Sequence, residues 1–177
     1  MKFIKKHKII SIAVVIIAAI AIIFICTNQK NDADDARLYC TLAVRCDTIL
    51  ESLEDLAPEK REIVPSDGVI FPERSVAFSE GESVFDVLVR EMKQNKIHLE
   101  FVNTPMYNSA YIEGIANLYE FDCGELSGWM YSVNGVFPNY GCSLYEVREG
   151  DKIEFVYTCD LGKDVGGELA AKQNENE

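Results

Sequence analysis

The stretch that decides the fold is SVFDVLVREMKQN, residues Ser83–Asn95. Ser83 and Asp86 have the spacing of a capping box, in which two side chains satisfy backbone N–H groups at the start of a helix. Four apolar residues then recur at i, i+3, i+4 and i+7, the spacing of one helix face: Phe85, Leu88, Val89 and Met92. The sequence therefore predicts one helix over residues 83–95, with this stripe in the core.

Extended segments on both sides of this helix indicate a sheet. Leu38–Cys46 (LYCTLAVRC) alternates strand-forming residues and predicts the first strand. Lys152–Cys159 (KIEFVYTC), which follows a turn at Gly150, predicts the last strand. Shorter extended pieces are expected at Val69–Phe71, Ser75–Phe78, Ile97–Val102, Tyr111–Glu113, Leu118–Phe121 and Trp129–Val133.

Two local signals complete this picture. Asn134-Gly135 follows Trp129–Val133 and is typical of a two-residue hairpin, which predicts Val136–Phe137 as the returning strand. Asp47 can cap a short helix that Pro58 ends. One strong helix packed on a mixed, mostly antiparallel sheet is an α+β domain.

The N-terminus predicts a membrane anchor. Residues 1–8 carry four lysines and no acidic residue, and Ile9–Cys26 is an apolar run of 18 residues interrupted by Ser11 alone. As a helix this run is about 27 Å long, close to the roughly 30 Å hydrocarbon core of a bilayer. Because basic flanks stay in the cytoplasm, the rest of the chain is expected outside the cell. The alternatives are a cleaved signal peptide and a lipid anchor at Cys26.

Composition sets the remaining boundaries. Residues 27–36 (TNQKNDADDA) form a polar linker, residues 37–165 form the folded domain, and residues 166–177 form a disordered tail without apolar periodicity. We therefore expect a single-pass protein of the cell membrane with an extracellular domain. A secreted or lipid-anchored domain is the alternative.

Charge and composition exclude several classes of function. Beyond residue 26 the chain has 13 basic against 29 acidic side chains, and so acidic a surface repels the phosphates of nucleic acids. His98 is the one histidine beyond residue 8, so a Ser-His-Asp set, a Cys-His pair or a histidine zinc site needs it. We expect no nucleic-acid partner, no enzymatic activity, no metal and no resident cofactor.

The cysteines predict disulfide bonds, because an exported chain meets oxidising conditions. Folding Leu144–Arg148 back onto the last strand about Gly150 would bring Cys142 near Cys159, and this is the first pair that we expect. The other pairings stay open: Cys123 with Cys46, Cys123 with Cys40, Cys46 with Cys159 if the first and last strands are neighbours, or no bond at all.

Aromatic residues gather between residues 129 and 157, with asparagines among them. Flat apolar rings with a polar tip suit ligand grooves and interfaces, although the same rings also fill cores. The loop FPNYG at 137–141 is aromatic where a plain connector is polar, and we expect Trp129 and Tyr131 to reach the rim of the sheet. The candidate ligand-binding residues are Trp129, Tyr131, Asn134, Asn139 and Tyr140.

Several motifs together resemble a known family. They are GWMYSVNG at 128–135, FPNYGCS at 137–143, EGDKI at 149–153, YTCDLGKD at 157–164 and EGESVFDVL at 80–88. The sequence around them resembles bacterial surface domains of unknown function that are related to the C-terminal domain of transcobalamin and intrinsic factor. The resemblance covers about residues 38–165, and it implies a β-grasp-like fold in which a sheet wraps one helix.

The same resemblance implies a function. In the vertebrate relatives this domain closes over cobalamin held by a separate helical domain. For this chain it implies a membrane-anchored, extracytoplasmic module that binds a small molecule, with a cobalamin-like compound as the possible ligand. The alternative is a structural or adhesive surface domain that contacts proteins or glycans through its aromatic residues.

Overall fold

The computed structural model describes residues 37–104 and 109–167. Every described helix and strand lies in the compact unit that begins at Leu38. The predicted cytoplasmic segment 1–8, membrane helix 9–26, linker 27–36 and most of the tail 166–177 lie outside the described residues. Among the residues that are described, no helix is long and apolar enough to cross a bilayer.

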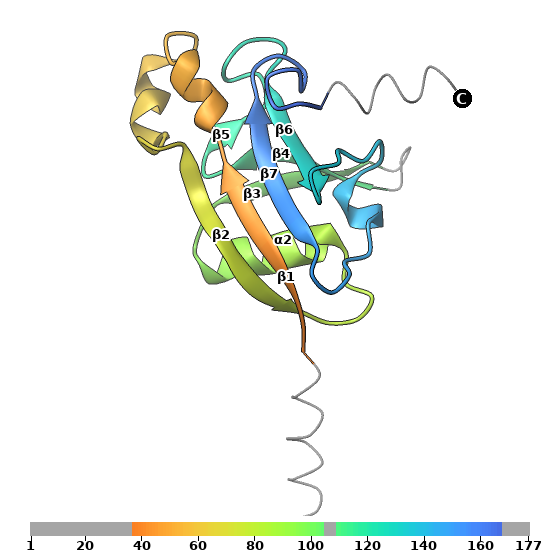
Figure 1. The fold of residues 1–177 in the computed structure, drawn as a ribbon. Helices are drawn as coiled ribbons and strands as arrows, with labels where there is room; N and C mark the ends of the chain where they lie inside the picture. The colour runs from red at the N-terminus through yellow and green to blue at the C-terminus, as the bar shows by residue number, and fades with distance from the viewer. Residues whose placement is uncertain (1–36, 105–108, 168–177) are drawn as a thin grey trace, which may run out of the picture. The chain divides into compact units, whose positions relative to one another are not determined.

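A four-stranded mixed sheet is built around the first and last strands (Figure 1). β1 (Leu38–Arg45) runs parallel to β7 (Lys152–Thr158), with Leu42 opposite Ile153 and Val44 opposite Phe155. On its outer sides the pair is flanked by antiparallel β2 (Val69–Phe78) and β6 (Gly128–Val133). The resulting order is β2-β1-β7-β6, so β6 is an edge strand.

The predicted helix is present as α2 (Val84–Gln94), and its capping box forms. The Ser83 side chain accepts the Asp86 N–H at 3.2 Å, while the Asp86 carboxylate accepts the Ser83 N–H at 2.9 Å. Two of the N–H groups that a helix start leaves unpaired are thereby satisfied. The backbone N–H of Val84 also donates to the Tyr145 carbonyl, which ties the helix to the C-terminal half of the domain.

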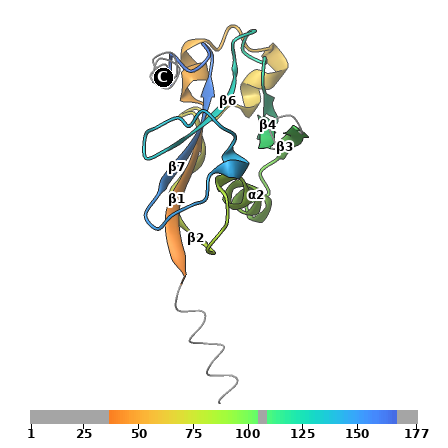
Figure 2. The ribbon, with the colours of Figure 1, turned by 90° about the vertical axis from the view of Figure 1, so that its right-hand side faces the viewer.

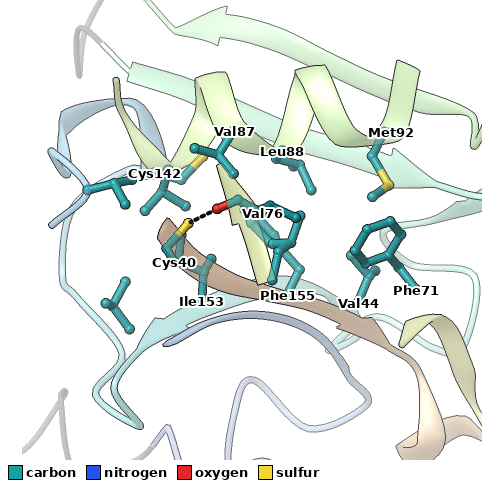
Figure 3. Close-up of a cluster of buried hydrophobic side chains, with 14 of the residues drawn as sticks. Cys40, Val44, Phe71, Val76, Val87, Leu88, Met92, Cys142, Ile153 and Phe155 are labelled. Atoms are coloured by element: carbon teal, nitrogen blue, oxygen red, sulfur yellow. Dashed lines mark hydrogen bonds between the residues drawn. The ribbon is translucent and has the colours of Figure 1, made fainter. Parts of the chain in front are cut away.

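The face of α2 that packs on the four-stranded sheet differs slightly from the predicted stripe. Leu88 and Met92 are fully buried as expected, and Val87 joins them (Figure 3). Val84 is fully buried as well. Phe85 is only half-buried and instead packs edge-to-face on Phe101, with ring centroids 4.7 Å apart. The helix packs against other elements on two sides. A single apolar stripe in the sequence predicts only one of these two contacts.

Those other neighbours form a three-stranded antiparallel sheet of β3 (Leu99–Thr104), β4 (Ser109–Ile115) and β5 (Leu118–Tyr119). Figure 2 shows α2 between β3 and the four-stranded sheet. The expected α+β class, with one main helix and mostly antiparallel sheets, is confirmed.

Three short 3₁₀ helices fill the connections: η1 (Asp47–Glu51), η2 (Pro58–Ile63) and η3 (Cys142–Leu144). The helix predicted from Asp47 onward is therefore shorter than expected. Pro58 begins the next 3₁₀ turn, a position where its missing N–H costs nothing.

Two strand predictions are corrected by tertiary pairing. Pro72 does not divide β2, because β2 is an edge strand in which a missing N–H is tolerated and the pairing with β1 slips near Val44. The segment after Asn134-Gly135 does not return as a strand beside β6, since only a single bridge joins Val133 to Val136. β7 takes that place instead, and it begins at Lys152, 16 residues after Val136.

The capping box makes a direct prediction about stability. Ser83→Ala removes the side chain that accepts the Asp86 N–H, and it should lower the free energy of unfolding by about 1 kcal/mol. For a domain of this size that is about 3 °C in melting temperature. Ser66→Ala in an exposed turn is the control and should melt like the wild type. Equal urea midpoints for Ser83→Ala and wild type would contradict the role of the cap.

Candidate ligand-binding site

A cavity of about 400 Å³ lies where the two sheets approach each other beside η3. Its walls come from four parts of the fold: the end of β3 with the first half of β4, the middle of β6, the loop before η3 together with η3, and one residue of β7. The lining residues are Thr104, Ser109, Ala110, Tyr111, Ile112, Trp129, Met130, Tyr131, Pro138, Asn139, Tyr140, Gly141, Cys142, Leu144 and Phe155.

The edge of β6 forms one wall. Trp129, Met130 and Tyr131 all line the cavity, although consecutive strand residues point to opposite faces. Trp129 and Tyr131 pack toward the helix-side core, whereas the Met130 sulfur lies against Gly162 on the other face. A cavity that touches all three side chains therefore reaches around the edge of the sheet.

Backbone groups of this edge are also oriented toward the cavity side. The Asn134 N–H donates to the Lys152 carbonyl, which fixes the alternation of hydrogen bonds between β6 and β7. By that alternation the N–H and C=O groups of Trp129 and Tyr131 point away from β7, toward the free side of the edge strand. The wall thus combines aromatic surface with backbone donors and acceptors.

Tyr131 and Tyr140 connect β6 to the aromatic loop. The Tyr131 hydroxyl donates to the Tyr140 carbonyl at 2.9 Å, and the Tyr131 ring stacks on Phe155 with centroids 6.0 Å apart. The Tyr140 ring stacks on Tyr145 and remains 45% exposed. Tyr131 is therefore a wall of the cavity that also supports the core, while Tyr140 stands at its mouth.

Trp129 has a structural role as well as a place in the cavity. Its indole N–H donates to the Leu118 carbonyl at 2.9 Å, and its ring packs edge-to-face on Tyr157 with centroids 5.2 Å apart. The two sequence interpretations for this side chain, core or rim, therefore both apply: the ring packs against buried residues and one side of it lines the cavity.

The opposite wall is held by Ser143 and Gly141. The Ser143 hydroxyl accepts the Ala110 N–H at 2.9 Å and lies 3.2 Å from the Ser109 hydroxyl, so η3 is attached directly to β4. A Cβ atom at Gly141 would lie 1.6 Å from the Ser109 hydroxyl oxygen and 2.7 Å from its Cβ. Only glycine permits this close approach of the loop to β4.

The lining is uncharged. It contains no Asp, Glu, Lys, Arg or His among the residues described, and its ionisable groups are tyrosines and Cys142. Burial raises the pKa of Cys142 to about 12 and raises that of Tyr131 above its ordinary value, so both stay protonated at neutral pH. The described part of the chain also has no cluster of three His, Cys, Asp or Glu side chains arranged to hold a metal ion.

Four of the five candidate ligand-binding residues lie together. Trp129, Tyr131, Asn139 and Tyr140 all line the cavity. Asn134 does not: its side chain donates to Asp151 at 2.8 Å and accepts the Lys152 N–H at 2.9 Å. It also adopts the left-handed backbone conformation with φ 55°, so its place is the turn between β6 and the following loop.

Sequence reasoning missed the β4 wall. Ser109, Ala110 and Ile112 approach β6 only because the three-stranded sheet folds over α2, and strand alternation alone does not show which distant strand it will face. Gly141 was a usable signal, since a glycine inside an aromatic loop often marks a close approach of two backbones.

The predicted disulfide between Cys142 and Cys159 is not formed. All five described cysteines are free thiols, and these two belong to separate clusters of buried side chains. The reason is topological: β7 pairs with β1 and β6, so residues 144–148 do not fold back on it. The first and last strands are neighbours, but Cys46 and Cys159 are free as well.

Comparison with known proteins agrees with the sequence resemblance. Residues 81–158 match the model of a protein family described as Domain of unknown function (DUF4430). The predicted family resemblance is confirmed. No curated protein matches the sequence.

One of two similar solved structures shows the shared fold. A crystal structure of haptocorrin in complex with Cbi matches 71% of this chain at 16% identity, with a TM-score of 0.52. The match spans only 26% of the haptocorrin chain, so this protein corresponds to about a quarter of it. A protein from Ruminococcus gnavus ATCC 29149, described as a "putative metal binding protein", matches 68% of this chain and 96% of its own length, at 16% identity and a TM-score of 0.40.

The close approach at Gly141 is open to test. Gly141→Ala should push Ser109 and the loop apart, and overpacking of this kind costs about 1–3 kcal/mol of unfolding free energy. Gly128→Ala is a matched control on β6, because its Cβ would meet Glu120 at an ordinary 3.6 Å. Thermal melts should show a lower midpoint for Gly141→Ala alone; equal midpoints for both variants would refute the steric argument.

Proposed function

We propose that this chain is a membrane-anchored, extracytoplasmic module that binds a small molecule in the cavity between β6, β4 and η3. The observation that carries the proposal is the cavity itself: it measures about 400 Å³, it is walled by Trp129, Tyr131 and Tyr140, and none of its described lining residues is charged. Cavities that hold small ligands are typically 300–1,000 Å³, mostly apolar, with a few polar groups that fix orientation.

The proposed ligand is an uncharged or locally neutral compound with a flat apolar part and amide-like polar groups. The flat part suits the rings of Tyr131 and Tyr140, which are supported from behind by Phe155 and Tyr145. The polar groups suit the outward N–H and C=O of Trp129 and Tyr131 at the edge of β6. Burying a charge here is disfavoured, because no lining side chain of the described residues would pair with it.

A cobalamin-like compound is the first candidate of this kind. Support comes from the fold shared with haptocorrin, whose structure contains Cbi. Cobalamin carries amide side arms around a macrocycle that is larger than the cavity. One arm would therefore enter between β6 and η3, while the macrocycle would lie over the exposed Tyr140 and Leu144.

The location is part of the same proposal. Lysines at positions 2, 5, 6 and 8 precede the apolar run Ile9–Cys26, and this order supports an anchor with its N-terminus in the cytoplasm. Secretion after cleavage, or lipid attachment at Cys26, are the alternatives. The proposal includes no catalytic step, because His98 is exposed directly before β3, beside Glu100, and does not line the cavity.

A second candidate function is adhesion to a protein or glycan. Val102 and Tyr111 face each other across β3 and β4 and are 43% and 45% exposed. Such exposed apolar pairs on an open sheet are typical of contact surfaces. This surface adjoins the cavity through Tyr111, so binding to a macromolecule would engage both.

Ligand binding depends on Tyr140 if the proposal is correct. Tyr140→Ala should weaken binding at least about tenfold, or 1.4 kcal/mol, because the exposed ring covers the cavity mouth. Isothermal titration with a panel of cobalamins and their truncated precursors measures this. The melting temperature should fall by only a few degrees, since the ring is half outside the core.

Matched variants distinguish the loss of a ligand contact in the cavity from a general loss of stability. Tyr39→Ala removes a tyrosine of similar exposure that does not line the cavity, and it should bind like the wild type. Tyr140→Phe keeps the ring and should retain most of the affinity. A Tyr140→Ala variant that binds normally but melts far lower would assign the ring to the core and remove this site. Binding to a glycan or protein panel without any cobalamin binding would favour adhesion.

The location makes a separate prediction. Protease added to intact, wall-stripped cells should remove residues 37–177, because the domain is expected outside the membrane. The measurement is an immunoblot with antibodies to the domain, with a cytoplasmic protein as the control. Survival of the full-length chain on intact cells, with degradation after lysis, would overturn the proposed topology.

A further inference from the structure

The second buried cluster of the domain contains a pair of neighbouring thiols. This cluster lies where β7 ends beside η1 and comprises Cys46, Ile49, Leu56, Leu118, Cys123 and Tyr157, with Cys159 packed against it. Cys123 belongs to the turn after β5, and Cys159 directly follows β7. Each of the two thiols is near enough to act on the pKa of the other. The Cys123 thiol donates to the Ser52 carbonyl at 3.4 Å.

We propose that Cys123 and Cys159 are an oxidisable pair that forms a disulfide, while Cys40, Cys46 and Cys142 remain thiols. The pair combines two requirements for bond formation: two cysteine side chains packed in one cluster, and segments far apart in sequence. Cys159 is in addition only half-buried, so an oxidant can reach it, whereas the other four described cysteines are buried.

The remaining cysteines have other neighbours. Cys40 lies in the helix-side core, where its thiol donates to the Val76 carbonyl at 3.9 Å (Figure 3). Cys142 belongs to the same core, on the side of α2 that carries Val87. Cys46 shares the second cluster, but the side chains that act on its thiol are Asp47 and Asp67. Among the described cysteines, Cys123 and Cys159 are thus the two that share a cluster and also act on the pKa of each other.

Bond formation follows ordinary thiol–disulfide exchange with a small disulfide such as oxidised glutathione. The Cys159 thiolate attacks one sulfur of the oxidant, which forms a mixed disulfide and releases one glutathione thiolate. The Cys123 thiolate then attacks the Cys159 sulfur and releases the second glutathione. The two cysteines lose two protons and two electrons, and glutathione gains them as two thiols.

Exchange is expected to be slow at neutral pH. Burial, the neighbouring Cys123 and the carboxylate of Asp164 raise the pKa of Cys159 to about 12, against a smaller lowering by the Thr48 hydroxyl. Burial also raises the pKa of Cys123, with Asp55 and Asp122 acting in the same direction. The thiolate fraction, and with it the rate, should rise between pH 7 and pH 9.

The bond would restrain the ligand cavity. The segment that it closes, from Cys123 to Cys159, contains β6, the aromatic loop with η3, and Phe155 of β7, which are three of the four parts of the cavity lining. A cross-link between the ends of this segment restricts the unfolded chain and so stabilises the folded state. This inference does not depend on the identity of any ligand.

The test uses the full chain in detergent with Cys26 replaced by Ser in every sample, so that only the five described cysteines react. Reduced protein is incubated with oxidised glutathione at pH 8.5, alkylated with iodoacetamide, and mapped by non-reducing peptide mass spectrometry. We expect a peptide pair linked through Cys123 and Cys159, with Cys40, Cys46 and Cys142 alkylated only after denaturation. The melting temperature should rise by about 5 °C or more and return on addition of dithiothreitol.

Matched variants make the outcome decisive. Cys123→Ser and Cys159→Ser should each abolish the linked peptide and the rise in melting temperature. Cys46→Ser, in the same cluster, should abolish neither. Mapping of the wild-type chain needs no variant to fold. Cys159 linked to Cys46 or Cys142, a stable glutathione adduct on Cys159, or free Cys123 and Cys159 thiols after oxidation would each overturn the proposal.

Discussion

The parallel pairing of β1 with β7 is the constraint on which the rest of the structure depends. It joins the start of the domain to its end, with Leu42 and Val44 opposite Ile153 and Phe155, and all four side chains are fully buried. Parallel neighbours need a long crossover, and here that crossover carries α2 and the second sheet. Because β1 occupies one side of β7, β6 is left on the other side as an edge strand with a free flank.

The cavity is a consequence of that free flank. The second sheet closes over α2 and brings β4 to within reach of β6, and the loop before η3 fills the remaining side. Gly141 lets the loop approach β4, and Ser143 holds it there through the Ala110 N–H. The pocket is thus made from elements that each have a packing role, which is why its aromatic residues serve the core and the cavity together.

The described charged side chains and the Cys123–Cys159 pair both lie apart from the cavity lining. The cavity lining carries no charged side chain among the residues described, although the chain as a whole has a formal charge of −12. Concentrating the acidic residues on other surfaces leaves the cavity suited to neutral groups. The Cys123–Cys159 pair lies in a separate cluster at the end of β7, so oxidation there would stabilise the cavity walls without altering their chemistry.

The sequence by itself determined the elements with strong local signals. The capping box at Ser83, the apolar spacing of α2 and the alternation in β1 and β7 gave the α+β class, and the motifs between residues 80 and 164 gave the family resemblance. The aromatic residues of 129–131 and of the loop 137–141 suggested four candidate residues that do line the cavity, and ligand binding by them stays a prediction. These features are encoded within a few residues of one another, so reading the chain locally is sufficient.

Only the tertiary structure decided which distant segments meet. It placed β7 rather than Val136–Phe137 beside β6, moved Asn134 out of the candidate site, and put Cys142 and Cys159 in different clusters. Each of these outcomes depends on pairings between strands that are far apart in the chain. Such pairings follow from how all the apolar faces are buried at once, and no local pattern of residues specifies that arrangement.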